Sequence, residues 1–173
     1  MMNVVVTVLH KGTFEEYEIG LPNDLDEYFI TLGLYEDWKE NKFFVCGIKS
    51  DYAFHGYDET ISLNNLNRLL YEFQSCTDEE QERILAIAEM YDDTYQGLWY
   101  AVERRDDFDL LHTTGKTDYE IGREVFHRHI SHFFLPKFED ALDLELFTQL
   151  LLIRGFAYNC SRGFLLKTSE IYL

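Results

Sequence analysis

The histidines His127, His129 and His132 form the one histidine cluster of this sequence, and histidine is a common metal ligand. If the segment is helical, His129 and His132 share a face because they are three residues apart, while His127 points well away from His129. A zinc site needs three or four ligands, so a further ligand would have to come from elsewhere in the chain. The sequence has no HExxH pattern. We therefore predict ordinary surface or partly buried histidines and no bound metal.

Other patterns of enzyme chemistry do not occur in the sequence either. It has no serine nucleophile elbow, P-loop or GxGxxG motif. Cys46, Cys76 and Cys160 are odd in number, widely spaced and without a CxxC pair, so we interpret them as reduced thiols. We predict that the protein is not an enzyme and uses no cofactor. A small enzyme is an alternative, which a buried, pKa-perturbed carboxylate or histidine in a deep pocket would favour.

Carboxylates are the groups that the sequence offers in excess. There are 32 Asp and Glu against 15 Lys and Arg, a net charge of −17, in a chain that is 46% hydrophobic and has 14 Phe and 12 Tyr. This aromatic content predicts a folded protein, because disordered acidic segments are poor in aromatics. Since such a net charge costs folded-state stability, we infer that the field is used outside the fold, by a strongly basic partner.

Charge and hydropathy also disfavour several classes of partner and location. A pI near 4.6 disfavours direct binding to nucleic acid or to an anionic membrane, which both attract basic proteins. The sequence has no apolar run of 18 residues and no signal-peptide pattern at its start, so we predict no membrane span and a cytoplasmic location.

Charge and pattern divide the chain into three parts. Residues 1–60 and residues 61–112 each hold 12 acids and 4 bases, whereas residues 113–173 hold 8 acids and 7 bases. We predict an α+β fold with an N-terminal α/β subdomain (1–60), an acidic helical subdomain (61–112) and a C-terminal α/β subdomain (113–173).

The first part should form a small sheet that carries one helix. The β-branched run 4–9 predicts a strand, a turn at 11–12 leads into a partner strand within 14–21, and residues 42–48 predict a third strand. A helix should follow Asp24 and end at Gly33, with its apolar face at Leu25, Tyr28, Phe29 and Leu32.

Helix start signals dominate the rest of the chain. Ser62 can cap a helix whose apolar positions are Leu63, Leu66, Leu69, Leu70 and Phe73. Capping boxes of the form T-x-x-E open two further helices, one at Thr77 that buries Ile84, Ile87, Ala88 and Tyr91, and one at Thr117 that runs to about residue 134. We also predict helices over 94–105, with Leu98, Trp99 and Val102 inward, and over 138–152, and then short strands at 156–158 and 164–166.

Each acidic cluster taken alone has an ordinary explanation, as a helix start or a solvated loop. The whole set of acidic clusters needs a further explanation, because ordinary soluble surfaces mix both signs of charge. DNA carries a negative charge about every 3.4 Å along each strand. An ionised carboxylate accepts bidentate hydrogen bonds from Arg as a phosphate does. Carboxylates spread over several small elements could therefore occupy the basic groove of a DNA-binding enzyme.

The segment from Phe43 to Leu69 resembles the ArdA antirestriction family, which comprises DNA mimics. The matching residues are Asp51-Tyr52, Asp58-Glu59 and the stretch 61–69. The family's antirestriction motif has a weaker counterpart at 138–146, where Phe138 and Asp140 match and no G-R-D-L occurs. The resemblance implies an elongated, three-part, non-catalytic protein that forms a homodimer and blocks a type I restriction-modification enzyme.

The function that we predict is antirestriction by mimicry of the charge pattern of B-DNA. The alternative is an acidic interaction module for another basic DNA-binding protein. The residues that would stand for phosphates are Asp24, Asp26, Glu27, Glu36, Asp37, Asp51, Asp58, Glu59, Asp78, Glu79, Glu80, Asp92, Asp93, Asp106, Asp107 and Asp109.

Overall fold

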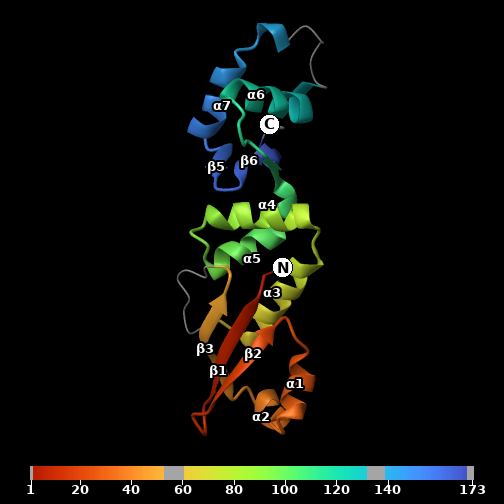
Figure 1. Ribbon diagram of the computed structural model, residues 1–173, viewed down its shortest axis with the longest axis vertical. Coiled ribbons are helices and arrows are strands. Elements are labelled where there is room, and N and C mark those ends of the chain that lie inside the picture. The colour runs from red at the N-terminus through yellow and green to blue at the C-terminus, as the bar shows by residue number, and fades with distance from the viewer. Residues whose placement is uncertain (1, 53–60, 132–138, 171–173) are drawn as a thin grey trace.

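The computed structural model describes residues 2–52, 61–131 and 139–170, and it has the predicted α+β architecture. An N-terminal sheet with helices, a helical middle and a small C-terminal sheet with helices follow one another along one long axis (Figure 1). The chain exposes 10198 Å², whereas a compact monomer of 20.6 kDa exposes about 8,900 Å². The excess surface fits the elongated shape.

The N-terminal sheet is antiparallel, with strand order β2-β1-β3. Its strands are β1 (Val4–His10), β2 (Glu16–Leu21) and β3 (Phe43–Ser50), which confirms the three predicted strands. Side chains alternate between the two faces of a strand, and in β1 Val4, Val6 and Val8 point into the core.

Two helices cover the far end of this sheet, where the sequence predicted one. In α1 (Leu25–Thr31), Leu25 and Phe29 are buried as expected. The prediction that Leu32 faces inward is wrong, because Leu32 is 42% exposed. Helix α1 ends before it, and the chain turns at Gly33 (φ 72°). The short helix α2 (Tyr35–Lys39) was not predicted, and its buried Trp38 stacks on Phe29 with ring centroids 4.8 Å apart.

The middle of the molecule consists of α3 (Leu63–Ser75), α4 (Asp78–Glu89) and α5 (Tyr95–Arg104), followed by a 3₁₀ turn (Arg105–Asp107). All five predicted apolar positions of α3 are buried, although the Ser62 side chain makes no capping hydrogen bond. Tyr91 was expected to be buried and is 38% exposed, because α4 ends at Glu89. Trp99 is half-buried.

The C-terminal part holds a second antiparallel sheet, of order β4-β6-β5, with helices against it. The predicted capping box is present at Thr117 and Glu120. The elements are β4 (Phe108–Leu111), α6 (Asp118–Val125), a π-helical turn (Phe126–Ile130), a 3₁₀ turn (Glu139–Ala141), α7 (Leu144–Ile153), β5 (Ala157–Cys160), β6 (Gly163–Lys167) and a 3₁₀ turn (Thr168–Glu170).

Two predictions for this part are corrected. No strand was predicted over residues 108–111, where β4 lies. The helix predicted over 138–152 begins at Leu144, as α7, and not at 138. The later start has a local cause, because the Asp143 side chain accepts a hydrogen bond from the backbone N–H of Leu146 at 3.0 Å and caps the helix there. Beyond residue 131, the predicted end of the preceding helix lies outside the described residues.

The C-terminal sheet is buried on both faces. Leu110 of β4 lies opposite Leu165 of β6, and both belong to a buried cluster that includes the N-terminal sheet and α3, α4 and α5. On the other face Leu111, Phe164 and Leu166 form a second buried cluster with residues of α6 and α7. The strand β6 is therefore shared between the two clusters.

None of the helices in the described ranges has the length and apolar character that crossing a membrane requires.

Candidate partner-binding surface

In the N-terminal part, two of the predicted acids hold the fold together. The Asp24 side chain caps α1 by accepting from the Glu27 N–H at 3.0 Å. Asp26 accepts from Lys39 Nζ at 2.7 Å and from Trp38 Nε1 at 2.9 Å. The hydrogen bonds from Lys39 and then Trp38 lower the pKa of Asp26, so this carboxylate fastens α1 to α2.

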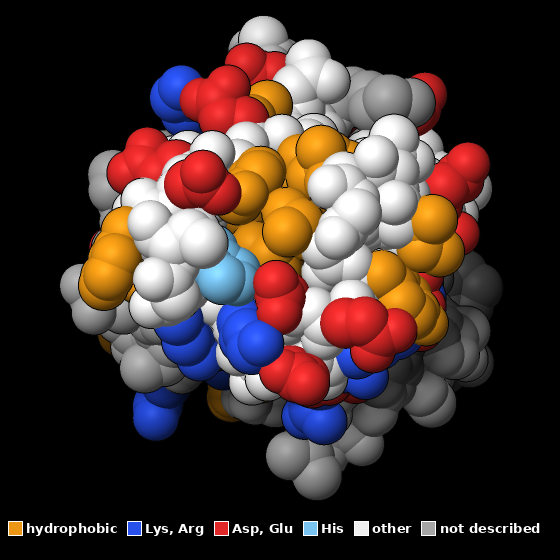
Figure 2. Space-filling model, turned by 90° about the horizontal axis from the view of Figure 1, so that it is seen from below, with side chains coloured by type: hydrophobic (Ala, Val, Ile, Leu, Met, Phe, Trp, Pro, Cys, Tyr) orange, Lys and Arg blue, Asp and Glu red, His pale blue; other side chains and the backbone are white. Residues whose placement is uncertain are grey.

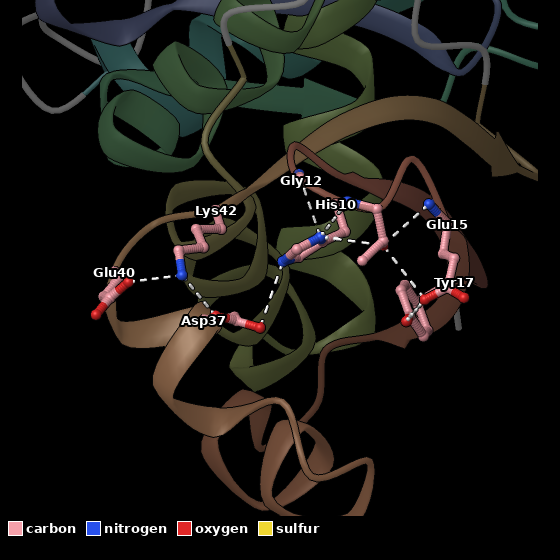
Figure 3. Close-up of polar contacts among 8 residues, drawn as sticks. His10, Gly12, Glu15, Tyr17, Asp37, Glu40 and Lys42 are labelled. Atoms are coloured by element: carbon pink, nitrogen blue, oxygen red, sulfur yellow. Dashed lines mark hydrogen bonds and ion pairs between the residues drawn. The ribbon is translucent and has the colours of Figure 1, made fainter.

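Asp37 lies in a polar network beside the first hairpin (Figure 3). Lys42 Nζ donates to Asp37 at 2.7 Å and pairs with Glu40 at the same distance, while Nε2 of His10 lies 3.4 Å from the second Asp37 oxygen. Lys42, more than His10, lowers the pKa of Asp37. The negative charge of Asp37 is thus balanced within the fold.

Other predicted acids of this part have no such partner. Glu27, Glu36 and Asp51 are exposed, and within the described ranges none of them forms an ion pair with Lys or Arg. Asp51 accepts a long hydrogen bond of 3.3 Å from Asn3. Their charges face solvent and are available to a partner.

The run Asp78-Glu79-Glu80 serves the start of α4, which bears out the ordinary explanation for part of this cluster. The side chains of Thr77 and Glu80 form the predicted capping box, and hydrogen bonds from Thr77 lower the pKa of Glu80. Glu79 lies 3.7 Å from Arg83, and Glu80 lies 3.7 Å from Arg105. Asp78 is exposed and, within the described part of the chain, has no ion-pair partner.

The turn between α4 and α5 presents Asp92 and Asp93 with left-handed φ angles of 53° and 51°. Asp92 is exposed. Asp93 lies beside the phenol of Tyr52, whose pKa is raised first by burial and then by the Asp93 charge. Asp tolerates left-handed backbone better than most residues. The turn therefore holds two adjacent carboxylates at one corner of the middle part.

The last predicted acids differ from one another. Asp106 is exposed, whereas Asp107 pairs with Arg104 at 2.7 Å. Asp109 of β4 points toward the π-helical turn that follows α6 and lies 3.3 Å from Arg128 and 2.8 Å from His129. Asp109 therefore acts as a link within the C-terminal part and contributes little outward charge.

The predicted acids thus divide by their partners. Those in ion pairs with Lys or Arg are Asp26, Asp37, Glu79, Glu80, Asp107 and Asp109. Those that have no such ion pair within the described part are Asp24, Glu27, Glu36, Asp51, Asp78, Asp92, Asp93 and Asp106. Asp58 and Glu59 lie outside the described residues.

The ion pairs consume most of the positive charge. Eleven of the 15 bases form ion pairs in the described part of the chain, and because the chain has 32 acids, the acids remain in surplus. The bases in ion pairs are Lys39, Lys42, Lys49, Arg68, Arg83, Arg104, Arg105, Lys116, Arg123, Arg128 and Arg162.

The histidines do not converge on one point. His127 lies 3.2 Å from Glu139 and His129 lies 2.8 Å from Asp109, while His132 is outside the described residues. In the ranges 2–52, 61–131 and 139–170, no three His, Cys, Asp or Glu side chains are arranged to hold a metal ion. Cys46, Cys76 and Cys160 are free thiols.

A hollow of about 350 Å³ lies where the end of β3 meets α3 and α4, and its lining includes Asp51, Tyr52, Asp78, Glu82 and Arg162. Arg162 pairs with Glu82 at 3.3 Å, so the cation in the lining is already balanced. The surplus charge of this hollow is negative, like that of the surrounding surface.

One acidic segment, at the first hairpin, was not among the predicted phosphate-mimic residues. Glu15 and Glu16 are exposed and, in the part that the structure describes, form no ion pair with Lys or Arg. Glu15 accepts a hydrogen bond from the Tyr17 phenol at 2.8 Å. The signal in the sequence is the adjacent pair of acids directly after a turn, which was interpreted only as the start of a strand.

No protein-family model matches this sequence, and a comparison with curated proteins finds no relative.

Proposed function

We propose that this protein is a non-enzymatic antirestriction protein that mimics the charge of B-DNA and occupies the DNA-binding groove of a type I restriction-modification enzyme. One observation carries the proposal. Exposed carboxylates that form no ion pair with Lys or Arg of the described residues, such as Glu27, Glu36, Asp78, Asp92 and Asp106, are spread over the N-terminal and middle parts of an elongated molecule.

The chemistry of the groove supports this choice of partner. An enzyme that binds DNA presents Lys and Arg to phosphates. Arg binds a carboxylate with the same bidentate hydrogen bonds as a phosphate, and Lys binds either anion as a point charge. An acidic protein also gains from the release of the ions that screen both surfaces, as DNA does. It offers no phosphodiester bond to cut, so binding leads to inhibition.

We further propose that the protein acts as a homodimer joined through α7. Leu146, Leu150 and Ile153 lie along one side of this helix and are 50%, 44% and 77% exposed. Residues 113–173 hold 8 acids and 7 bases, so two copies would not repel each other strongly there, as the other parts would. Sedimentation of the wild type and of Leu150→Asn tests this, and a monomeric wild type would refute the dimer.

The proposed function is tested by a DNA-cleavage assay with a purified type I enzyme. We expect inhibition to be complete at a stoichiometric amount of this protein and to weaken steeply as salt increases, because surface charges are screened. A type II endonuclease with a small DNA contact serves as control. Full cleavage in the presence of a molar excess at low salt would contradict the proposal, and recovery of another basic protein from a pull-down would point to the alternative partner.

A further inference from the structure

The turn of the first hairpin holds Phe14 in a conformation that is unusual for its type. Phe14 has φ 59°, in the left-handed region, and its side chain is 74% exposed. Left-handed backbone is disfavoured for a bulky residue, and an exposed ring contributes little to the core. Neither the conformation nor the exposure of Phe14 helps the chain to fold.

The imidazole of His10 holds the turn in place (Figure 3). His10 is 6% exposed, and its Nδ1 accepts hydrogen bonds from the backbone N–H groups of Gly12 at 3.2 Å and Thr13 at 3.0 Å. Because Nδ1 is an acceptor, the neutral ring carries its proton on Nε2, which lies 3.4 Å from Asp37.

Backbone hydrogen bonds complete this arrangement. The Phe14 N–H donates to the His10 carbonyl at 2.9 Å, and the His10 N–H donates to the Glu15 carbonyl at 3.0 Å. The backbone of the turn is therefore fixed from inside, and it holds Phe14 where its ring is exposed to solvent. A turn whose backbone is ordered before binding loses less entropy on binding.

Apolar and acidic side chains lie together at this end of the molecule. Figure 2 views the end and shows apolar side chains in the centre of the face, with acidic and basic side chains around them. Glu15 and Glu16 follow Phe14 directly, and Ile30 of α1 is 59% exposed. An apolar anchor with acids beside it complements an apolar pocket with bases beside it.

We propose that Phe14 is an anchor that enters an apolar pocket in the DNA-binding groove of the enzyme, next to Lys or Arg side chains that bind Glu15 and Glu16. This inference rests on the proposed function and adds a contact that DNA cannot make. Aromatic anchors carry a large share of the binding energy in protein interfaces, whereas a single exposed ion pair carries little.

The test compares Phe14→Asn with Phe14→Tyr, which keeps the ring, and with Tyr119→Asn, which removes another exposed aromatic side chain, 50% exposed, from α6. Asn adopts left-handed backbone readily. We expect Phe14→Asn to unfold at the wild-type temperature or up to about 4 °C above it. We expect it to bind the purified type I enzyme at least about tenfold more weakly, while the two controls bind like the wild type.

Each outcome decides the question. If the wild type binds and Phe14→Asn binds equally well, the anchor is refuted and the proposed function stands. If the wild type does not bind, the proposed function fails and the partner of Phe14 fails with it. A lower unfolding temperature of Phe14→Asn would show that the ring supports the fold. An altered sedimentation of this variant would show that the ring serves self-association. Either result overturns the inference.

Discussion

The first two parts of the molecule and its last part treat their charges differently. Each of the parts 1–60 and 61–112 has three times as many acids as bases, while 113–173 is close to neutral. In the last part, Glu124 pairs with Lys116 and Arg128, and Arg123 pairs with Glu139 at 3.0 Å. The difference shows that ion pairing is the rule where bases are supplied. The negative surface elsewhere results from a lack of bases and needs no unusual geometry.

The strongest test of this comparison removes the unpaired acids from the first two parts. We expect Glu27→Gln, Glu36→Gln, Asp78→Asn, Asp92→Asn, Asp93→Asn and Asp106→Asn combined to weaken binding to a type I enzyme roughly a hundredfold, because each exposed pair contributes little and six act together. Asn tolerates the left-handed turn at 92 and 93, so the fold should persist. Inhibition of DNA cleavage, measured against protein concentration, gives the result.

A control that removes two acids from each kind of region separates the effect of the position of the charges from the effect of their number. Glu27→Gln with Glu36→Gln should weaken inhibition measurably, whereas Asp118→Asn with Glu145→Gln, in the near-neutral part, should not. Equal losses from both pairs would mean that total charge matters and its location does not.

The next test addresses packing in the near-neutral part. A Cβ at Gly122 of α6 would lie 2.3 Å from the Leu144 carbonyl oxygen and 2.5 Å from Thr148 Oγ1. Gly122→Ala should therefore lower the free energy of unfolding by about 1–3 kcal/mol. Gly20→Ala is the matched control, because nothing lies within 4 Å of a Cβ there. Urea denaturation measures the free energy of unfolding of both variants. If Gly122→Ala were as stable as the wild type, α6 and α7 would pack less closely than described.

Smaller effects are expected at the two capping boxes, one in each kind of region. Thr77→Ala and Thr117→Ala each remove a hydroxyl that accepts a hydrogen bond from a Glu N–H, and each should cost about 1 kcal/mol of unfolding free energy. Thr→Ser at either position should keep most of the stability. A much larger loss at Thr77 would indicate that α4 depends on its cap because of the surrounding acids.

The smallest effect is a difference in pH dependence. The pKa values of Asp26, Asp37 and Glu80 are lowered in the fold by Lys39, Lys42 and Thr77 respectively. A lowered folded-state pKa stabilises the protein above the ordinary value near 4, and this contribution is lost as pH falls through the folded value. Protonation of the unpaired acids relieves repulsion and opposes that loss. Thermal unfolding between pH 7 and 3 should therefore show a steeper decline in the six-residue variant than in the wild type.

Local patterns in the sequence were enough to predict much of the fold. The apolar spacing of α3 and the Thr-Glu pairs of α4 and α6 depend on neighbours within one or two turns, and the structure confirms them. Strand β4 was missed because it has four residues and its partner β6 lies more than fifty positions away. The five-residue helix α2 is too short to show a period.

The acids of the surface could be counted from the sequence, but their pairing could not be predicted. Arg162 meets Glu82 across the junction of β5–β6 with α4, and Lys49 meets Glu18 across two edge strands. Such pairs depend on the folded arrangement and leave no periodic signal. The exposure of Phe14 was hidden for the same reason, because it depends on a turn whose backbone the buried imidazole of His10 holds.

The strand β6 has a consequence for motion. It is the central strand of its sheet, and four of its residues, 163–166, are buried in succession. Ser161 and Arg162 also bind Glu89 and Glu82 of α4. Swinging the C-terminal part away would bring Leu110 and Leu165 into water, so we expect the amide protons of β6 to be among the last to exchange with deuterium. A protein built in this way holds its carboxylates at fixed spacings on one rigid body and not on domains that move about a hinge.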